Sequence, residues 1–338
     1  MFIGLALAIT GSAIFLLTGW PNPAFRARLG RVLRRTLGII YWADPDQSAP
    51  AGTRYETFFS PTVGRQVSYL VYLPRDYQRA AATRYPVIYW LHSLGGNQRE
   101  GAYTFVPRLD AAIRSGEAPA AIVVLVNGLG DSRFCDSYDG KMPVERVIIA
   151  DLIPHIDATY RTVATRDGRA VEGFSMGGFG AAHLGFKYPE VFGVVSLLAG
   201  ALWDGESVAK PPRERLYGRN FGGKNEYFEY NSPWNLVTWN VSAIRGRTFV
   251  RVVTGDQDGL SVLSRKYHEL LENLKIEHEY NLLPGIGHDE NGLYRALEKR
   301  LFAFYTRAFG KLDSHGLTST VGPIKKRDSP DGFQLFLR

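Results

Sequence analysis

The chain has 338 residues, of which 45% are hydrophobic and 22% charged, a composition typical of a globular protein. Its single cysteine, Cys135, excludes an intramolecular disulfide framework, and the scattered histidines show no ligand spacing for zinc, so we predict no metal site. Much of the formal net charge of +7 sits in an arginine cluster before residue 36 and in the C-terminal tail, and the body lacks nucleic-acid-binding motifs, so we expect no nucleic-acid partner.

The first 24 residues carry no charged side chain and contain the run FIGLALAITGSAIFLLTGW, which is close to the minimum length for one transmembrane helix. We interpret residues 1–24 as an uncleaved membrane anchor. Two alternatives are a cleaved signal peptide, which would make the protein secreted, and a helix buried against the core.

Residues 25–54 follow as a basic amphipathic helix and a linker. The stretch AFRARLGRVLRRTLGIIYW places apolar residues at helical spacing with arginines between them, which suits a helix in the lipid headgroup layer. These features predict membrane association. The positive-inside rule favours the cytoplasmic side for the arginines, and the sequence alone leaves the side open.

From residue 55 to residue 310, strand-like and helix-like runs alternate. A hairpin is predicted in YETFFSPTVGRQVSYLVYLP, and later strands are predicted at 85–92, 120–128, 247–255 and 278–285 and in RAVEGF and FGVVSLLAG. Helices are predicted in VERVIIADLIPHIDATY and MGGFGAAHLGFKY and at 261–275 and 290–309. The alternation predicts an α/β fold with a mostly parallel central sheet and helices on both faces.

Two further segments are set apart by their composition. Residues 201–246 are rich in glycine, proline, asparagine and aromatic residues, and we interpret them as a long loop that forms a cap or pocket wall. Residues 311–338 form a polar C-terminal tail.

The pattern Gly-Phe-Ser-Met-Gly at residues 173–177 fits a nucleophile elbow between a strand and a helix. The chain must turn sharply with Ser175 at the apex, so Gly173 and Gly177 are required where side chains would collide. The N-terminus of the following helix favours a developing oxyanion. The pattern therefore predicts Ser175 as a nucleophile.

A serine nucleophile needs a base, a carboxylate that orients the base, and an oxyanion hole. His288 lies on a glycine-rich loop before the last predicted helix, the expected place for the base, whereas Asp256 and Asp258 are both plausible acids by position. Met176 and Leu94 are predicted to supply the two backbone amides of the oxyanion hole. His92, in the same WLHSLGGNQ motif as Leu94, is expected to hold the loop.

Residues 55–310 resemble the putative esterase family of α/β-hydrolases, which includes feruloyl esterases, S-formylglutathione hydrolases, enterochelin esterases and mycolyltransferases. The motifs that carry the resemblance include VYLPRDY, YPVIYWLHSLGGN, GRAVEGFSMGGFGAAHLGFKYPEVFG and GDQDGLSVLSRKYHELLENLKIEHEYNLLPGIGHDE. The resemblance implies the α/β-hydrolase fold, Ser175 as nucleophile, His288 as base and Asp258 as triad acid. Many members have glycine where this chain has Ser93, so the oxyanion loop is expected to differ there.

We therefore expect a serine esterase that uses no cofactor and hydrolyses a small-molecule or glycan-linked carboxylic ester through an acyl-enzyme. The alternatives are transfer of the acyl group to an alcohol or sugar and, as a third reading, a non-catalytic binding module. Asp136, Tyr138, Trp203 and Trp234 are predicted to line the substrate pocket. The acyl group, the alcohol group and the oligomeric state are left unspecified.

Overall fold

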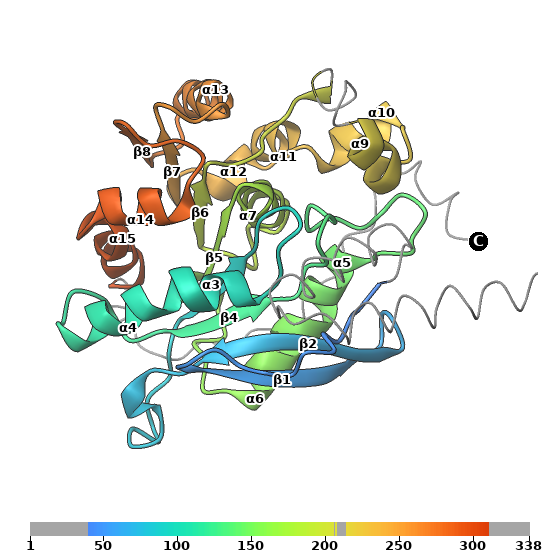
Figure 1. Ribbon diagram of the computed structural model, residues 1–338. Coiled ribbons are helices and arrows are strands. Elements are labelled where there is room, and N and C mark those ends of the chain that lie inside the picture. Colours follow the sequence, from blue (N-terminus) through green and yellow to red (C-terminus); the bar gives the residue numbers. More distant parts are fainter. Residues whose placement is uncertain (1–39, 206, 208–213, 311–338) are drawn as a thin grey trace, which may run out of the picture. The chain divides into compact units, whose positions relative to one another are not determined.

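The computed structural model describes residues 40–205, 207 and 214–310 (Figure 1). The predicted anchor at 1–24, most of the predicted amphipathic helix and the tail at 311–338 lie outside the described residues. Among the residues that are described, no helix combines the length and apolar character needed to cross a membrane. Contacts divide the chain into Met1–Trp42 and Ala43–Arg338, and every element named below belongs to the second unit.

An eight-stranded sheet with the order β1-β2-β4-β3-β5-β6-β7-β8 forms the centre of this unit. The strands are β1 Thr53–Ser60, β2 Arg65–Tyr72, β3 Val87–Leu91, β4 Ile122–Val126, β5 Arg169–Phe174, β6 Val194–Leu198, β7 Phe249–Gly255 and β8 His278–Leu283. Strands β3 to β8 run parallel to one another, whereas β2 pairs antiparallel with both β1 and β4. The predicted mostly parallel sheet is therefore present.

The inner strands form where the sequence has short, continuous apolar runs. Every residue of β3 (VIYWL) and β4 (IVVLV) is buried, as expected for strands that are covered on both faces. In the β1–β2 hairpin, β1 is largely uncovered whereas the last six residues of β2 are buried, and the turn uses Gly64 at a φ of 62°. Because parallel strands end at the same edge, the loops after β3, β5, β6 and β7 meet at the carboxyl edge of the sheet.

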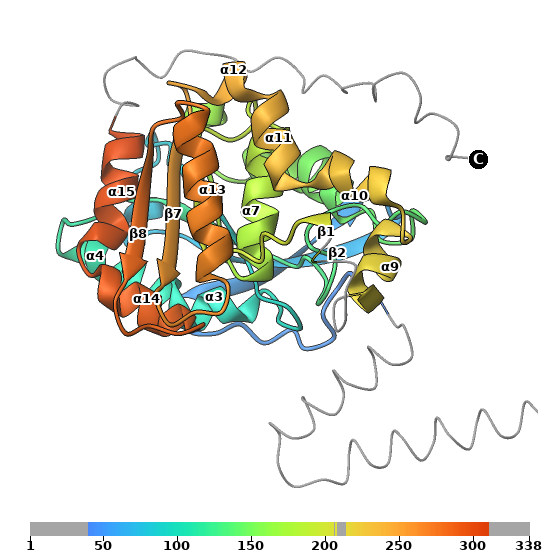
Figure 2. The ribbon, with the colours of Figure 1, turned by 90° about the horizontal axis from the view of Figure 1, so that it is seen from above.

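Helices cover both faces of the sheet (Figures 1 and 2). They are α3 Arg99–Thr104, α4 Val106–Arg114, α5 Val144–Arg146, α6 Ile153–Thr159, α7 Met176–Lys187, α9 Glu214–Phe221, α10 Asn225–Asn231, α11 Pro233–Trp239, α12 Val241–Ile244, α13 Ser261–Asn273, α14 Glu290–Leu297 and α15 Arg300–Phe309. Figure 2 shows β7 and β8 between α13 on one side and α14 and α15 on the other. The core on the α14–α15 side is built around Phe105, Tyr294 and Tyr305, which pack on Trp90 and its neighbours.

Two predictions about helices are wrong in detail. Residues 290–309 form two helices instead of one, because Glu298 takes a φ of 49° and breaks the chain direction between α14 and α15. The break lets Leu293 and Leu297 of α14, and then Phe304 of α15, all reach the same core. Residues 201–246 are also not a long loop, since the described part contains α9 to α12, and these helices bury Phe221, Phe228 and Leu236.

Candidate active site

Ser175 stands between β5 and α7 in a strained backbone conformation. Its φ is 58° and its ψ is −112°, a region that residues other than glycine rarely adopt and that costs about 1–3 kcal/mol. Strand β6 and the loop after it hold it there: Ser175 N–H donates to Leu198 O at 2.9 Å, and Ala201 N–H donates to Ser175 O at 3.0 Å. The turn therefore presents the hydroxyl at the carboxyl edge of the sheet.

The two glycines that flank the serine are required by close backbone approach. A Cβ atom on Gly173 would lie 2.4 Å from the carbonyl carbon of Gly177, and a Cβ atom on Gly177 would lie 2.1 Å from Leu91 O. Both distances are too short for any real side chain. The predicted collision of side chains at positions 173 and 177 with the backbone is thus present in the structure.

Three side chains from separate strand-end loops form a continuous hydrogen-bonded chain. His288 Nε2 lies 2.9 Å from Ser175 Oγ, and His288 Nδ1 lies 2.8 Å from Asp258 Oδ2. The Asp258 side chain is 1% exposed and that of His288 is 40% exposed, so the carboxylate is shielded while the imidazole faces solvent. With Nδ1 donating to the carboxylate, Nε2 is the nitrogen that can accept the serine proton.

The structure distinguishes the two aspartates that position alone left open. Asp258 Oδ2 contacts His288, and Asp258 Oδ1 accepts the Leu260 N–H at 2.7 Å, which orients the carboxylate. Asp256 Oδ1 instead accepts the Gly285 N–H at 2.8 Å and so braces the loop after β8. Only Asp258, of these two residues, is paired with the imidazole.

The predicted oxyanion donors lie at the start of α7 and in the loop after β3. Met176 is the first residue of α7, where the N–H groups have no acceptor within the helix. Leu94 lies in the loop after β3, which is held in place by the Gly95 N–H donating to Gly130 O at 2.5 Å and the Gly96 N–H donating to Ser93 O at 3.0 Å. Gly95 has a φ of 77°, which favours glycine at that point of the turn.

His92 holds the loop of Leu94 through hydrogen bonds with backbone atoms. It is fully buried, its Nδ1 lies 2.9 Å from Ser93 O, and its Nε2 lies 3.2 Å from the Gly128 backbone nitrogen. The two contacts are satisfied when Nδ1–H donates and Nε2 accepts, that is, by the neutral ring. Burial lowers the pKa of His92 and favours this form.

A residue that sequence analysis missed, Glu100 of α3, also holds the loop. Its Oε2 accepts the Ser93 N–H at 2.9 Å and its Oε1 accepts the Ser93 hydroxyl at 3.1 Å. A glycine at position 93 would make only the first of these bonds. The departure from the family pattern at Ser93 was the signal in the sequence, but nothing in it pointed to Glu100 as the partner.

Of the four predicted pocket residues, Asp136 and Tyr138 lie in the loop at 127–141, and Trp203 and Trp234 lie in residues 201–246. Asp136 forms an ion pair with Arg146 at 2.6 Å, and burial raises the pKa of Asp136 to about 6. The ring of Tyr138 packs edge-on against that of Tyr227, with centroids 5.3 Å apart.

The two tryptophans pack against residues of 201–246 and of neighbouring helices. Trp203 packs against a cluster that includes Phe179 and Phe221, and Trp234 Nε1 donates to Leu202 O at 3.1 Å. Trp234 in addition packs edge-on against Tyr267, with centroids 5.0 Å apart. Contact of these four residues with substrate stays a prediction.

Comparisons with known proteins agree with this geometry. A family model described as "Putative esterase" matches residues 60–290. A curated protein of Xylanibacter ruminicola named endo-1,4-beta-xylanase/feruloyl esterase is 34% identical over 166 residues, which are 46% of this chain and 22% of that protein. An esterase of Mycobacterium tuberculosis is 36% identical over 138 residues, which are 40% of this chain and 29% of that protein. The chain thus spans less than a third of the length of either relative.

Solved structures show the same fold. A ferulic acid esterase superposes with a TM-score of 0.66 at 24% identity, over 76% of this chain and 98% of that one. An S-formylglutathione hydrolase from Agrobacterium tumefaciens superposes with a TM-score of 0.62 at 17% identity, over 77% of this chain and 98% of the other. At these identities the likeness concerns the arrangement of strands and helices.

Proposed function

The chain belongs to the putative esterase family, and from this premise we propose that it is a serine esterase that hydrolyses carboxylic esters through Ser175, His288 and Asp258. The observation that carries the proposal is the hydrogen-bonded chain from Ser175 Oγ through the imidazole of His288 to Asp258 Oδ2, at 2.9 and 2.8 Å. A nucleophile, a base and an orienting carboxylate within hydrogen-bonding reach are what acyl transfer to serine requires.

The reaction follows from these contacts in two halves. His288 Nε2 takes the proton of Ser175 Oγ as Oγ attacks the ester carbonyl carbon, and the imidazolium then gives that proton to the departing alcohol. The acyl-enzyme that remains is attacked by water, whose proton passes to the same nitrogen and then back to Ser175 Oγ as the carboxylic acid leaves. Asp258 stabilises the imidazolium in both halves.

The negative charge that develops on the carbonyl oxygen needs donors that are already in place. We assign these donors to the backbone N–H groups of Met176 and Leu94, with the N-terminal dipole of α7 adding to the attraction. Loss of one such donor costs about 3 kcal/mol of transition-state stabilisation in serine hydrolases. The contacts of His92 and Glu100 with Ser93 serve this function by holding the loop of Leu94.

Feruloyl esters are the first specific substrates to test. The name of the Xylanibacter ruminicola relative supports them, and its identity of 34% is confined to a part of the chain. Aromatic side chains of the cap, such as Trp203, are chemically suited to an aromatic acyl group. A panel of p-nitrophenyl acetate, p-nitrophenyl butyrate and methyl ferulate separates general esterase activity from this preference.

The test of the proposed function is Ser175→Ala. We expect kcat/KM on p-nitrophenyl acetate to fall by about 10⁴-fold or more, because the nucleophile is removed while the fold remains. Ser115→Ala, on an exposed serine at the end of α4, is the matched control and should keep full activity. Labelling by a fluorophosphonate probe should likewise be lost only in Ser175→Ala. Unchanged hydrolysis by a folded Ser175→Ala protein would reject the assignment.

A further inference from the structure

Glu290 is the first residue of α14 and lies two residues after His288. Its side chain is partly buried and turns toward Thr104, the last residue of α3. Thr104 Oγ1 lies 2.8 Å from Glu290 Oε1 and 3.0 Å from the backbone carbonyl oxygen of Glu100. The hydroxyl thus connects the histidine loop to α3, and no step of the proposed reaction uses this contact.

The Thr104 hydroxyl has a single proton but faces two oxygen atoms. If it donates to the carbonyl of Glu100, as threonine hydroxyls in helices often do to the residue four positions earlier, it has only lone pairs left for Glu290. A carboxylate at Glu290 could then offer no proton, whereas a neutral carboxyl group can donate one to Thr104 Oγ1. When Glu290 is protonated, each of the two short contacts has its own proton and both are hydrogen bonds at the same time.

The surroundings of Glu290 also favour the neutral form. Among the charged groups of the described residues that act on it electrostatically, the carboxylates of Glu100 on α3 and Glu172 on β5 disfavour its ionisation, whereas one cation, Arg108 on α4, favours it. Arg108 is itself bound to the carbonyl of Thr104 and lies 5.7 Å from the centre of the Tyr294 ring. Burial is the largest cause, and together with the two carboxylates it outweighs the lowering by the Thr104 hydroxyl and Arg108 and raises the pKa of Glu290 to about 8.

The far end of α3 reaches the oxyanion loop. The Glu100 carboxylate holds the Ser93 N–H at 2.9 Å and the Ser93 hydroxyl at 3.1 Å, one residue before Leu94. A chain of contacts therefore runs from the loop of His288, through Glu290 and Thr104, to the loop that carries a proposed oxyanion donor. The two loops must keep their spacing for the serine, the imidazole and the amide to act on one carbonyl.

We propose that Glu290 is a positioning residue that acts as a neutral carboxylic acid, donating a hydrogen bond to Thr104 and so joining the catalytic-histidine loop to the oxyanion loop. This inference rests on the proposed esterase function. When Glu290 ionises, its negative charge faces the carbonyl-bound hydroxyl of Thr104 and the carboxylate of Glu100, and the link between the two loops weakens. The reaction then slows although His288 is in its active form.

The test is the pH dependence of kcat/KM on p-nitrophenyl butyrate, read at the isosbestic wavelength of p-nitrophenol and corrected with Ser175→Ala. The kcat/KM of the wild type should fall at least about threefold below its plateau value as the pH rises through about 8. Glu290→Gln, which has the same shape and is neutral at every pH, should keep the acidic limb of the wild type and remain active on the alkaline side. Glu290→Ala should be about tenfold slower at pH 7, because it removes the contact itself.

Asp289→Asn is the matched control, since Asp289 directly follows His288 but is exposed and paired with Arg295 at 3.5 Å. It removes a carboxylate that does not contact α3, so the alkaline loss should persist in this variant. An alkaline limb in Glu290→Gln equal to that of the wild type would overturn the proposal, as would a wild type without such a limb. Neither result touches the esterase assignment, which depends on Ser175→Ala.

Unfolding in urea supplies a readout that does not depend on turnover. A carboxyl group with a folded-state pKa near 8 and an unfolded pKa near 4.5 stays protonated to a higher pH in the folded state. The free energy of unfolding of the wild type should therefore fall as the pH rises between these values and level off above 8. The Glu290→Gln protein should lack this fall, and its stability relative to the wild type should increase over the same interval. Parallel stability curves for the two proteins would contradict a neutral Glu290.

Discussion

The His288–Asp258 pair and the His183–Glu145 pair join the same two chemical groups at 2.8 and 2.6 Å, but in opposite surroundings. His288 meets Ser175 at the N-terminus of α7, and its side chain is 40% exposed. The side chain of His183, about two turns further along α7, is completely buried. A histidine beside a carboxylate is therefore not by itself a catalytic arrangement.

The difference lies in what the second ring nitrogen meets. His288 Nε2 faces the hydroxyl of Ser175, a group that can give up a proton. His183 Nδ1 lies 2.9 Å from the backbone carbonyl oxygen of Asn231, so its two nitrogens face two acceptors and neither is available as a base. The buried pair can only hold structure together.

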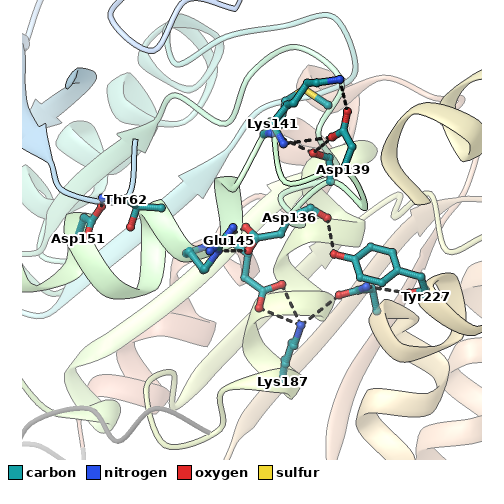
Figure 3. A network of polar contacts seen from close by, with 12 residues as sticks. Thr62, Asp136, Asp139, Lys141, Glu145, Asp151, Lys187 and Tyr227 are labelled. Atoms are coloured by element: carbon teal, nitrogen blue, oxygen red, sulfur yellow. Dashed lines mark hydrogen bonds and ion pairs between the residues drawn. The ribbon is translucent and has the colours of Figure 1, made fainter. Parts of the chain in front are cut away.

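Glu145 of the buried pair also binds Lys187, and Figure 3 shows Lys187 pointing at the Glu145 carboxylate. Lys187 Nζ lies 2.9 Å from Glu145 Oε1 and 3.1 Å from Asn231 Oδ1. Glu145 comes from α5, Lys187 from α7 and Asn231 from α10. The network thus joins α10 and α5 to α7, the helix that begins directly after Ser175.

The sharpest test of this comparison exchanges each histidine for alanine. His288→Ala should lower kcat/KM by about 10⁴-fold or more with little change in stability, because the base is lost from a solvent-facing site. His183→Ala should instead lower the free energy of unfolding by about 3 kcal/mol, because Glu145 loses a buried partner. Its hydrolysis rate per folded molecule should stay within about tenfold of the wild type. Ester hydrolysis and urea unfolding measure the two effects, and a reversed pattern would refute the comparison.

The next effect separates the two aspartates of the loop after β7. Asp258→Asn should reduce kcat by about 10³- to 10⁴-fold, since the amide cannot stabilise an imidazolium and favours the wrong tautomer. Asp256→Asn keeps an oxygen that can accept the Gly285 N–H and should remain within about threefold of the wild type. Steady-state kinetics on one ester decides between them. Equal losses in both variants would show that the loop, and not the carboxylate on His288, controls the rate.

The smallest expected effect on the reaction, and a clear one on stability, comes from Glu145→Gln. Burial alone would raise the pKa of Glu145, but the charges of Lys187 and His183 outweigh it and hold the pKa well below its usual range. The carboxylate therefore contributes stability above its unfolded pKa of about 4.5, and this contribution is lost as the pH falls toward the lower folded value. Urea unfolding at pH 7 should show a loss of about 3 kcal/mol in the variant, and the gap to the wild type should narrow below pH 4.5. A gap that widens in acid would contradict the charged network.

Local sequence patterns were sufficient for the strands, for the elbow and for the regions of α5 to α7 and α13 to α15, whereas α3, α4 and α9 to α12 were not predicted. The apolar runs VIYWL and IVVLV and the pattern Gly-Phe-Ser-Met-Gly act over a few residues, so they could be recognised without any knowledge of distant contacts. The helices within residues 201–246 were missed because the glycines and asparagines of this segment resemble a loop. Its helices bury aromatic residues, such as Phe221 and Phe228, against other parts of the molecule.

The amino-acid sequence by itself determined that the Ser175 hydroxyl would stand at a tight strand-to-helix turn and that a loop with His288 would follow the last strand. Both features depend on steric requirements and strand order that a short stretch of sequence shows. Only the tertiary structure decided that Asp258 and not Asp256 contacts the imidazole of His288. The same holds for the hydrogen bonds between Glu100 and Ser93 and between Glu290 and Thr104, which are 186 residues apart in the chain. Such contacts depend on how strand-end loops converge at one edge of the sheet, a convergence that no spacing along the chain encodes.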